Sequence, residues 1–89
     1  MNKIIDPFTV NLPHLDLHGE TTWSSEVLIN NFIRDNLILH NYQIVIIHGK
    51  STGILKNKTK EVLSKNKKVN NYYIDPMNDG ETIVELKKE

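Results

Sequence analysis

The chain has 89 residues, a mass of 10.3 kDa and no formal net charge at pH 7, with 38% hydrophobic and 25% charged residues. A chain of this length forms one domain and needs most of its apolar side chains for a single core. It has no cysteine, which excludes disulfides, a thiolate nucleophile and cysteine-ligated metal sites. We find no signal peptide and no apolar run long enough to span a membrane, so we expect a cytoplasmic domain without a membrane partner.

The neutral total conceals a basic segment. Residues 50–68 contain seven lysines and a single acid, Glu61. The segments on either side, 1–49 and 69–89, each contain two basic and five acidic residues. A basic segment of this kind either binds nucleic acid or another anion, or is a solvated helix face. Charge alone leaves both interpretations open.

The first part of the chain predicts a short strand after an irregular lead-in. Residues 1–11 contain no regular pattern, so we place the domain at residues 12–89. Apolar and polar residues alternate over 14–18, which is typical of a strand with one apolar face. Gly19 ends this strand.

A helix is predicted next, capped by Thr21 or Thr22 and ending near Asn41. Its buried face has apolar residues at helical spacing, namely Leu28, Ile29, Phe32, Ile33 and Leu37. We also expect Trp23 to lie in the core or at its edge, together with one of Tyr72 and Tyr73.

The second half predicts one strand, one helix and two further strands. The β-branched run at 43–47 indicates a strand covered on both faces, and a helix follows over 54–63. Strands at 69–75 and 82–87 flank the turn sequence of residues 75–80. The order β-α-β-α-β-β predicts an α/β fold, a two-layer sandwich with two helices on a mixed four-stranded sheet.

Polar residues follow the first two predicted strands. Because a helix joins these strands, we expect them to be parallel, with their carboxyl ends at one edge of the sheet. Open α/β sheets bind ligands at that edge. Residues 16–19 and 48–53, about 30 residues apart, should therefore meet in one crevice.

The second of these segments, Gly49-Lys50-Ser51-Thr52-Gly53, is suited to bind phosphate. Its glycines permit close approach of the backbone, and the helix behind it offers free N–H groups. A nucleotide-binding P-loop is excluded by spacing, because Ile44 stands where that motif requires glycine. An ordinary strand–helix turn remains the structural alternative.

Three histidines near this edge suggest proton transfer. One of His18 and His48 could take a proton from an attacking oxygen and the other could give one to the leaving oxygen. Asp16 would orient an imidazole, more easily that of His48 than that of His18. The alternatives are that Asp16 stabilises a turn, or that His14, Asp16 and His18 bind a metal, which their strand spacing disfavours.

The sequence resembles the Smr (small MutS-related) domain family. Residues 15–19, Leu-Asp-Leu-His-Gly, match the first family motif completely. The second motif is matched at His48, Gly49, Gly53 and Leu55. Ser51 replaces its middle glycine and Lys56 its arginine, which alters the loop because serine disfavours positive φ and lysine lacks the guanidinium fork. Gly80 and Thr82 fit the turn before the last strand.

The resemblance implies a fold like the C-terminal domain of translation initiation factor three, nucleic-acid binding and endonuclease activity. It makes Asp16 and His18 the expected catalytic pair and places His48 in the half of the site that contacts phosphate, while the proton-transfer argument above makes His48 the third expected catalytic residue. The residues expected to contact phosphate are Gly49, Lys50, Ser51, Thr52, Gly53, Lys56 and Lys60. Some family members act on mRNA at stalled ribosomes, which makes the ribosome a further expected partner.

We predict cleavage of RNA rather than nicking of DNA. RNA supplies its own nucleophile, the 2′-hydroxyl, so no cofactor and no metal is required. On DNA a water must attack, and Mg²⁺ would be recruited to activate it. The alternative is a non-catalytic module that binds RNA or the ribosome through the basic second helix. A third alternative, that the domain belongs to a larger MutS-related protein, stays open.

Overall fold

Six elements follow one another in the predicted order. They are β1 (His14–Asp16), α1 (Thr22–Ile38), β2 (Gln43–Ile47), α2 (Ile54–Lys65), β3 (Val69–Asp75) and β4 (Asn78–Leu86). The structure is a computed structural model that describes residues 9–88. Most of the predicted lead-in lies outside these residues, and its last part, 9–11, forms a turn in which the Leu12 N–H donates to the Thr9 carbonyl at 3.0 Å.

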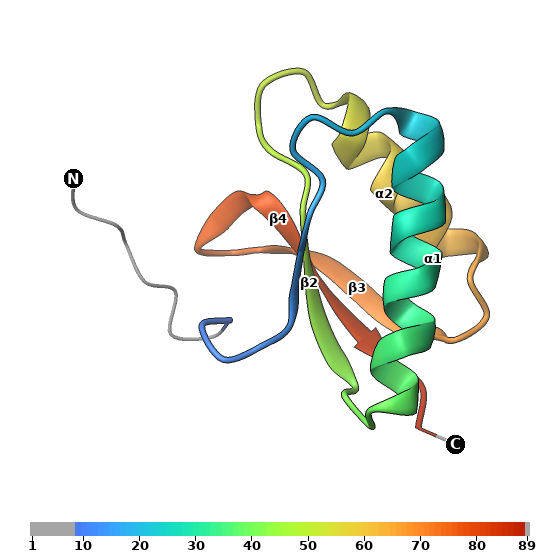
Figure 1. Ribbon diagram of the computed structural model, residues 1–89. Coiled ribbons are helices and arrows are strands. Elements are labelled where there is room, and N and C mark those ends of the chain that lie inside the picture. Colours follow the sequence, from blue (N-terminus) through green and yellow to red (C-terminus); the bar gives the residue numbers. More distant parts are fainter. Residues whose placement is uncertain (1–8, 89) are drawn as a thin grey trace.

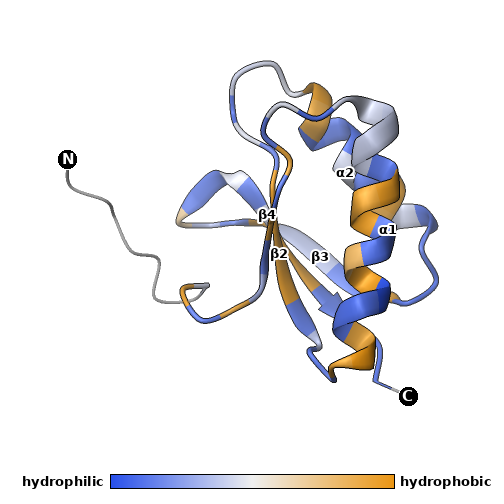
Figure 2. Ribbon diagram, viewed as in Figure 1, coloured by the Kyte–Doolittle hydropathy of each residue, from blue (hydrophilic) through white to orange (hydrophobic). Residues whose placement is uncertain are grey.

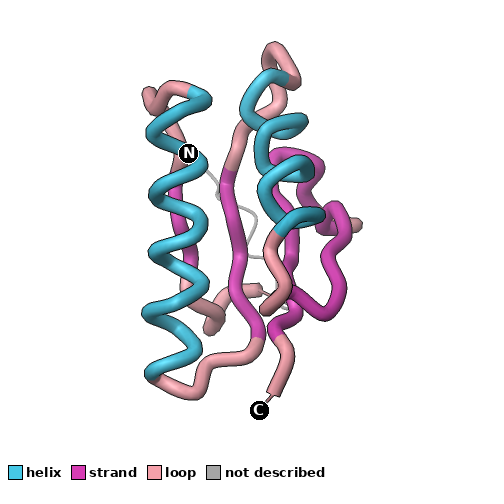
Figure 3. The backbone as a smooth tube through the Cα atoms, turned by 90° about the vertical axis from the view of Figure 1, so that its right-hand side faces the viewer, coloured by secondary structure: helices cyan, strands magenta, loops and turns pink. Residues whose placement is uncertain are grey.

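The sheet is mixed and both helices cover the same face of it (Figures 1 and 3). Its strand order is β1-β2-β4-β3, with β1 parallel to β2 and β4 antiparallel to both of its neighbours. The predicted two-layer α/β sandwich is thereby confirmed. Within the described residues no helix is both long and apolar enough to cross a membrane.

The core lies between the sheet and the two helices. The side chains that fill it are Leu17, Ile29, Ile33, Ile44, Ile46, Val62, Leu63, Val84 and Leu86. Figure 2 shows apolar residues gathered along β2 and on α1. The intervening residues Val45 and Ile83, which pair across β2 and β4, are also buried on the opposite face. The prediction that β2 is covered on both faces is therefore confirmed.

Helix α1 begins with a reciprocal cap. Thr21 Oγ1 accepts a hydrogen bond from the Ser24 N–H at 3.0 Å, and Ser24 Oγ accepts one from the Thr21 N–H at 2.9 Å. This arrangement satisfies backbone donors that the first helical turn leaves free. The helix ends at Ile38, slightly before the predicted stop, and His40 then adopts a positive φ of 61°.

The prediction for Trp23 is wrong, because its side chain is 78% exposed. The buried residues of α1 begin with Ser25 and continue with Ile29, Ile33 and Asn36. Trp23 precedes Ser25 by two residues, which places it roughly 200° around the helix from that buried row. Of the two tyrosines, Tyr72 packs against the core and Tyr73 is exposed, as the prediction of one core tyrosine requires.

The last strand is longer than predicted. The carboxylate of Asp75 accepts a hydrogen bond from the Met77 N–H at 2.8 Å, which closes the turn within two residues. The chain then pairs again from Asn78, so that Gly80 belongs to β4 instead of to the turn. This places the β3–β4 hairpin at the end of the sheet that carries the predicted site.

Candidate functional site

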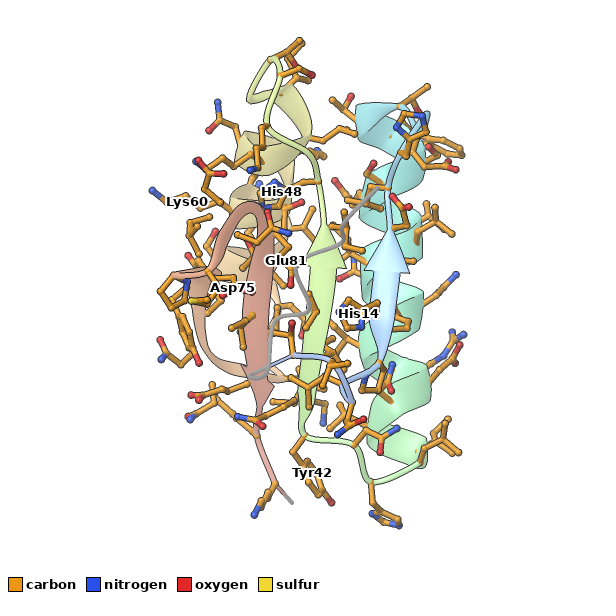
Figure 4. All side chains as sticks on the ribbon, turned by 90° about the vertical axis from the view of Figure 1, so that its left-hand side faces the viewer. His14, Tyr42, His48, Lys60, Asp75 and Glu81 are labelled. Carbon is orange, nitrogen blue, oxygen red and sulfur yellow. The ribbon has the colours of Figure 1, made fainter. Side chains whose placement is uncertain are left out.

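Strands β1 and β2 end side by side, as predicted. Asp16 is paired with Ile47, and the Leu17 N–H donates to the Ile47 carbonyl at 2.9 Å. Both strands point toward the same end of the molecule in Figure 4. The segments that carry the predicted site residues therefore leave the sheet at one edge.

Asp16 and His18 form an exposed pair at this edge. Asp16 Oδ1 accepts a hydrogen bond from the backbone N–H of His18 at 2.8 Å, and the chain then turns through Gly19 at φ 80°. Between them, Leu17 is fully buried and anchors the turn in the core. The imidazole of His18 is exposed and makes no hydrogen bond within residues 9–88.

His48, in contrast, is buried and held at both ring nitrogens. Nδ1 lies 3.0 Å from the Gly49 carbonyl oxygen, and Nε2 lies 2.9 Å from Thr82 Oγ1. Because a carbonyl oxygen only accepts, we assign the proton to Nδ1, and Nε2 then accepts from the Thr82 hydroxyl. Burial lowers the pKa of His48 below its ordinary value, with the positive charge of Lys56 acting in the same direction. His48 is therefore neutral at pH 7.

The expected contact between Asp16 and His48 is not formed. Asp16 is paired with Ile47, so the side chains of both residues lie on the face of the sheet that the helices do not cover. His48 is one residue further along and so turns to the helix face, where Thr82 is its partner. The alternation of side chains along a strand thus separates two residues whose backbones are neighbours.

The lowered pKa of His48 predicts a stability that depends on pH. As the pH falls through 6.5, the unfolded chain binds a proton that the folded chain excludes. The contribution of His48 to the free energy of unfolding should therefore be constant above pH 6.5 and decrease as the pH falls below that value. The hydrogen bond to the Gly49 carbonyl, and after it the charges of Glu81 and Asp79, act to raise the pKa of His48, but burial outweighs them.

Urea unfolding at about pH 7.5 and about pH 5.5 measures this effect. The variant His48→Gln should lose much of the pH dependence, whereas the matched variant His18→Gln should keep it because that side chain is exposed. An equal pH dependence in His48→Gln and the wild-type chain would contradict the prediction.

The loop after β2 contains two glycines in the left-handed region. Gly49 and Gly53 adopt φ values of 79° and 76°. Among the described residues His40 is the one non-glycine residue with a positive φ, so Ser51 fits the loop without that strain. Gly53 caps α2 without a side-chain hydrogen bond, and the Ile54 N–H reaches Thr52 Oγ1 at 3.3 Å. The N-terminal end of α2 is consequently open to an anion.

The β3–β4 hairpin forms a third wall of the site, which the sequence did not predict. The Gly80 carbonyl accepts hydrogen bonds from the N–H groups of both His48 and Gly49, each at 2.9 Å. Lys50 Nζ lies 3.2 Å from Asp79 Oδ1 and lowers the pKa of that carboxyl. Gly80 and Thr82 are present in the family motif, but only the pairing of β4 with β2 explains why they matter.

The four lysines of α2 fall into two groups. Lys58 contacts Glu26 at 2.9 Å and Glu61 at 3.3 Å, while Lys65 lies 3.5 Å from Glu61. The pairs with Glu61 lie within α2, and the pair of Lys58 with Glu26 joins α2 to α1. Lys56 and Lys60, on another side of α2, form no ion pair within residues 9–88. Figure 4 shows Lys60 at the same end of the molecule as His48.

The described residues contain no group of three or more histidine, aspartate or glutamate side chains that could hold a metal ion. His14 Nδ1 lies 2.6 Å from the carbonyl oxygen of Leu12.

Comparison with known proteins identifies the family. Residues 15–87 match the Smr domain. The chain belongs to the Smr domain family. Over 76 residues it is 40% identical to endonuclease MutS2 of Geobacillus sp. (strain WCH70) and 36% identical to endonuclease MutS2 of Alkaliphilus metalliredigens (strain QYMF). Each alignment covers 82% of this chain and 10% of the relative, so this Smr domain spans about a tenth of the curated relatives it matches.

Solved Smr domains have the same fold. The Smr domain of Thermus thermophilus MutS2 superposes with a TM-score of 0.84 at 25% identity, covering 86% of this chain and all of that one. YdaL, a stand-alone small MutS-related protein from Escherichia coli, superposes with a TM-score of 0.79 at 21% identity, covering 84% of this chain and 64% of that one. The resemblance of the sequence to this family is confirmed in both motif and fold.

Proposed function

We propose that this Smr domain is a nucleic-acid endonuclease that cleaves RNA with His18 and Asp16. The observation that carries the proposal is the exposed Asp16–His18 pair, which lies at the same sheet edge as the open N-terminal end of α2. The MutS2 relatives of this chain are endonucleases by name, which supports the same reaction class.

In the proposed reaction His18 moves one proton. Its imidazole takes the proton from a ribose 2′-hydroxyl, whose oxygen forms a bond to the adjacent phosphorus. The bond from phosphorus to the 5′-oxygen breaks, and the imidazolium returns the proton to that leaving oxygen. The products are a 2′,3′-cyclic phosphate and a 5′-hydroxyl. Neither a water molecule nor a protein side chain has to act as the nucleophile in this step, because the 2′-oxygen attacks the phosphorus.

Asp16 and the glycine loop support this step. Asp16 fixes the turn that presents His18, and its negative charge stabilises the imidazolium that forms during transfer. The N–H groups at the start of α2 and the charge of Lys56 attract the scissile phosphate. Lys50 joins them when a phosphate displaces its exposed carboxylate partner, Asp79.

We assign His48 a positioning role. Both of its ring nitrogens are occupied, by the Gly49 carbonyl and by Thr82, and these contacts tie the glycine loop to β4. Proton delivery by His48, which the sequence predicts, would require substrate to replace Thr82 as its partner. The loop geometry at Gly49 is the feature that His48 maintains.

Cleavage of an end-labelled single-stranded RNA tests the proposal. We expect a cleavage activity that co-elutes with the protein in size-exclusion chromatography, which excludes a contaminating nuclease of different size. The activity should persist in EDTA and leave a 2′,3′-cyclic phosphate on the product. The matched DNA, which lacks the 2′-hydroxyl, should not be cut. Cutting that depends on Mg²⁺ and extends to DNA would replace this mechanism with metal-assisted hydrolysis.

Absence of cutting with RNA binding intact would overturn the enzymatic proposal. Lys56 and Lys60 form no ion pair within the described residues, so the non-catalytic alternative has a specific basis in α2. Binding should weaken with salt under either proposal, since phosphate contacts release counterions. Affinity alone therefore cannot separate the two functions.

A further inference from the structure

A small cavity lies between α2 and the β3–β4 hairpin, outside the catalytic pair. Its volume is about 190 Å³. The side chains that line it include Lys56, Asn57, Lys60, Tyr72, Ile74 and Thr82. Typical small-molecule sites have roughly 300–1,000 Å³, so this cavity is suited to a single ring system.

Thr82 connects the cavity to the site already described. Its hydroxyl donates to His48 Nε2 on one side, and its side chain lines the cavity on the other. A ligand in the cavity would therefore lie next to the loop that His48 holds. The cavity is an extension of the proposed cleavage site along α2.

The lining combines three chemistries that a nucleotide requires. Tyr72 and Ile74 provide an aromatic and an apolar surface, on the strand face that looks toward α2. The Asn57 side chain makes no hydrogen bond within residues 9–88, so it offers a free donor and a free acceptor. Lys56 and Lys60, four residues apart on one side of α2, add two positive charges that form no ion pair within residues 9–88.

We propose that this cavity binds the base of one unpaired nucleotide, with its phosphate held by Lys56 and Lys60. This inference rests on the proposed function, and it specifies the substrate as single-stranded at that position. A base within a duplex is stacked and paired, so it cannot enter a cavity of this size. Asn57 reads the edge of the base, and Tyr72 contacts its ring.

Binding of a 2′-O-methyl oligoribonucleotide of about six residues tests the cavity, because a single-strand site takes about 4–16 nucleotides. The blocked 2′-oxygen prevents cleavage, so fluorescence anisotropy measures binding alone. Removing one base at a time should identify one position at which loss of the base weakens binding about 5- to 150-fold. Equal affinities for all the abasic oligonucleotides would overturn the inference.

Two exposed substitutions link that position to the cavity. Asn57→Ala should weaken binding of the intact oligonucleotide and reduce the penalty of the critical abasic site, whereas Asn31→Ala, exposed on α1, should do neither. Lys60→Gln should make the negative slope of log affinity against log salt concentration less steep by about 0.7. Lys67→Gln, outside the cavity lining, should leave that slope unchanged. Identical effects of the cavity and control variants would contradict the inference.

The two proposals fail separately. An abasic penalty that depends on Asn57, in a chain that cuts no unmodified RNA, would retain the base site and remove the nuclease. Cleavage of RNA with no abasic position that matters would retain the nuclease and remove the base site.

Discussion

Replacing His18 by alanine is expected to lower the rate of RNA cleavage at least about 100-fold, because general acid–base catalysis typically contributes a factor of about 10²–10⁴. The side chain is exposed and makes no hydrogen bond within residues 9–88, so its removal should leave the fold and the RNA affinity unchanged. Single-turnover cleavage and anisotropy, measured on the same RNA, separate the two quantities.

His14 provides the matched control for this experiment. It is also an exposed histidine on β1, but its ring is directed to the Leu12 carbonyl. His14→Ala should cleave at the wild-type rate. Asp16→Asn preserves an oxygen that can accept from the His18 N–H and removes the charge, so it should slow cleavage without opening the turn. A His18→Ala variant as active as the wild-type chain would refute the assignment.

Replacing Ile46 by alanine is expected to destabilise the domain by about 2–5 kcal/mol, since it leaves a cavity in a packed core. Ile46 is fully buried in β2, two residues before His48 and on the same face. For a domain of this size each kcal/mol corresponds to about 4–8 °C in the melting temperature. Thermal unfolding should therefore show a decrease in the melting temperature of at least about 8 °C.

Ile38→Ala is the matched control, because the same atoms are removed from a side chain that is 70% exposed. We expect it to change the free energy of unfolding by less than about 0.5 kcal/mol. Similar losses in the two variants would mean that β2 is not the centre of the core.

Local sequence patterns predicted the helices and strands well where the apolar residues follow a single helical or strand spacing. The β-branched run of β2 and the apolar spacing of α1 identified both elements, and the parallel pairing of β1 with β2 followed from the helix between them. Trp23 was misplaced because it was expected in the core as an aromatic residue, although its position on α1 turns it away from the buried row. The start of β4 was missed because Asn78 and Gly80 are typical turn residues, and here they pair as a strand beyond a two-residue turn.

The site was predicted only in part, since its long-range partners are not adjacent in sequence. The motifs placed Asp16, His18 and the glycine loop at one edge, where the structure has them. They did not indicate that Asp16 and His48 lie on opposite faces of the sheet. Asp16 pairs with Ile47, and His48, as the next residue, points to the other face. Thr82, which holds His48, was part of a motif but carried no predicted role, because its contact spans 34 residues.

The carbonyl of Gly80 has a consequence for the order in which the chain folds. It accepts from the N–H groups of His48 and Gly49, so the glycine loop takes its shape only when β4 pairs with β2. The β3–β4 hairpin is a local structure, whereas pairing β4 with β2 must close over the whole of α2 and β3. Non-local pairing of this kind is the slow, cooperative part of folding. The start of the glycine loop therefore depends on a non-local strand pairing, because the N–H groups of His48 and Gly49 meet their acceptor only when β4 lies beside β2.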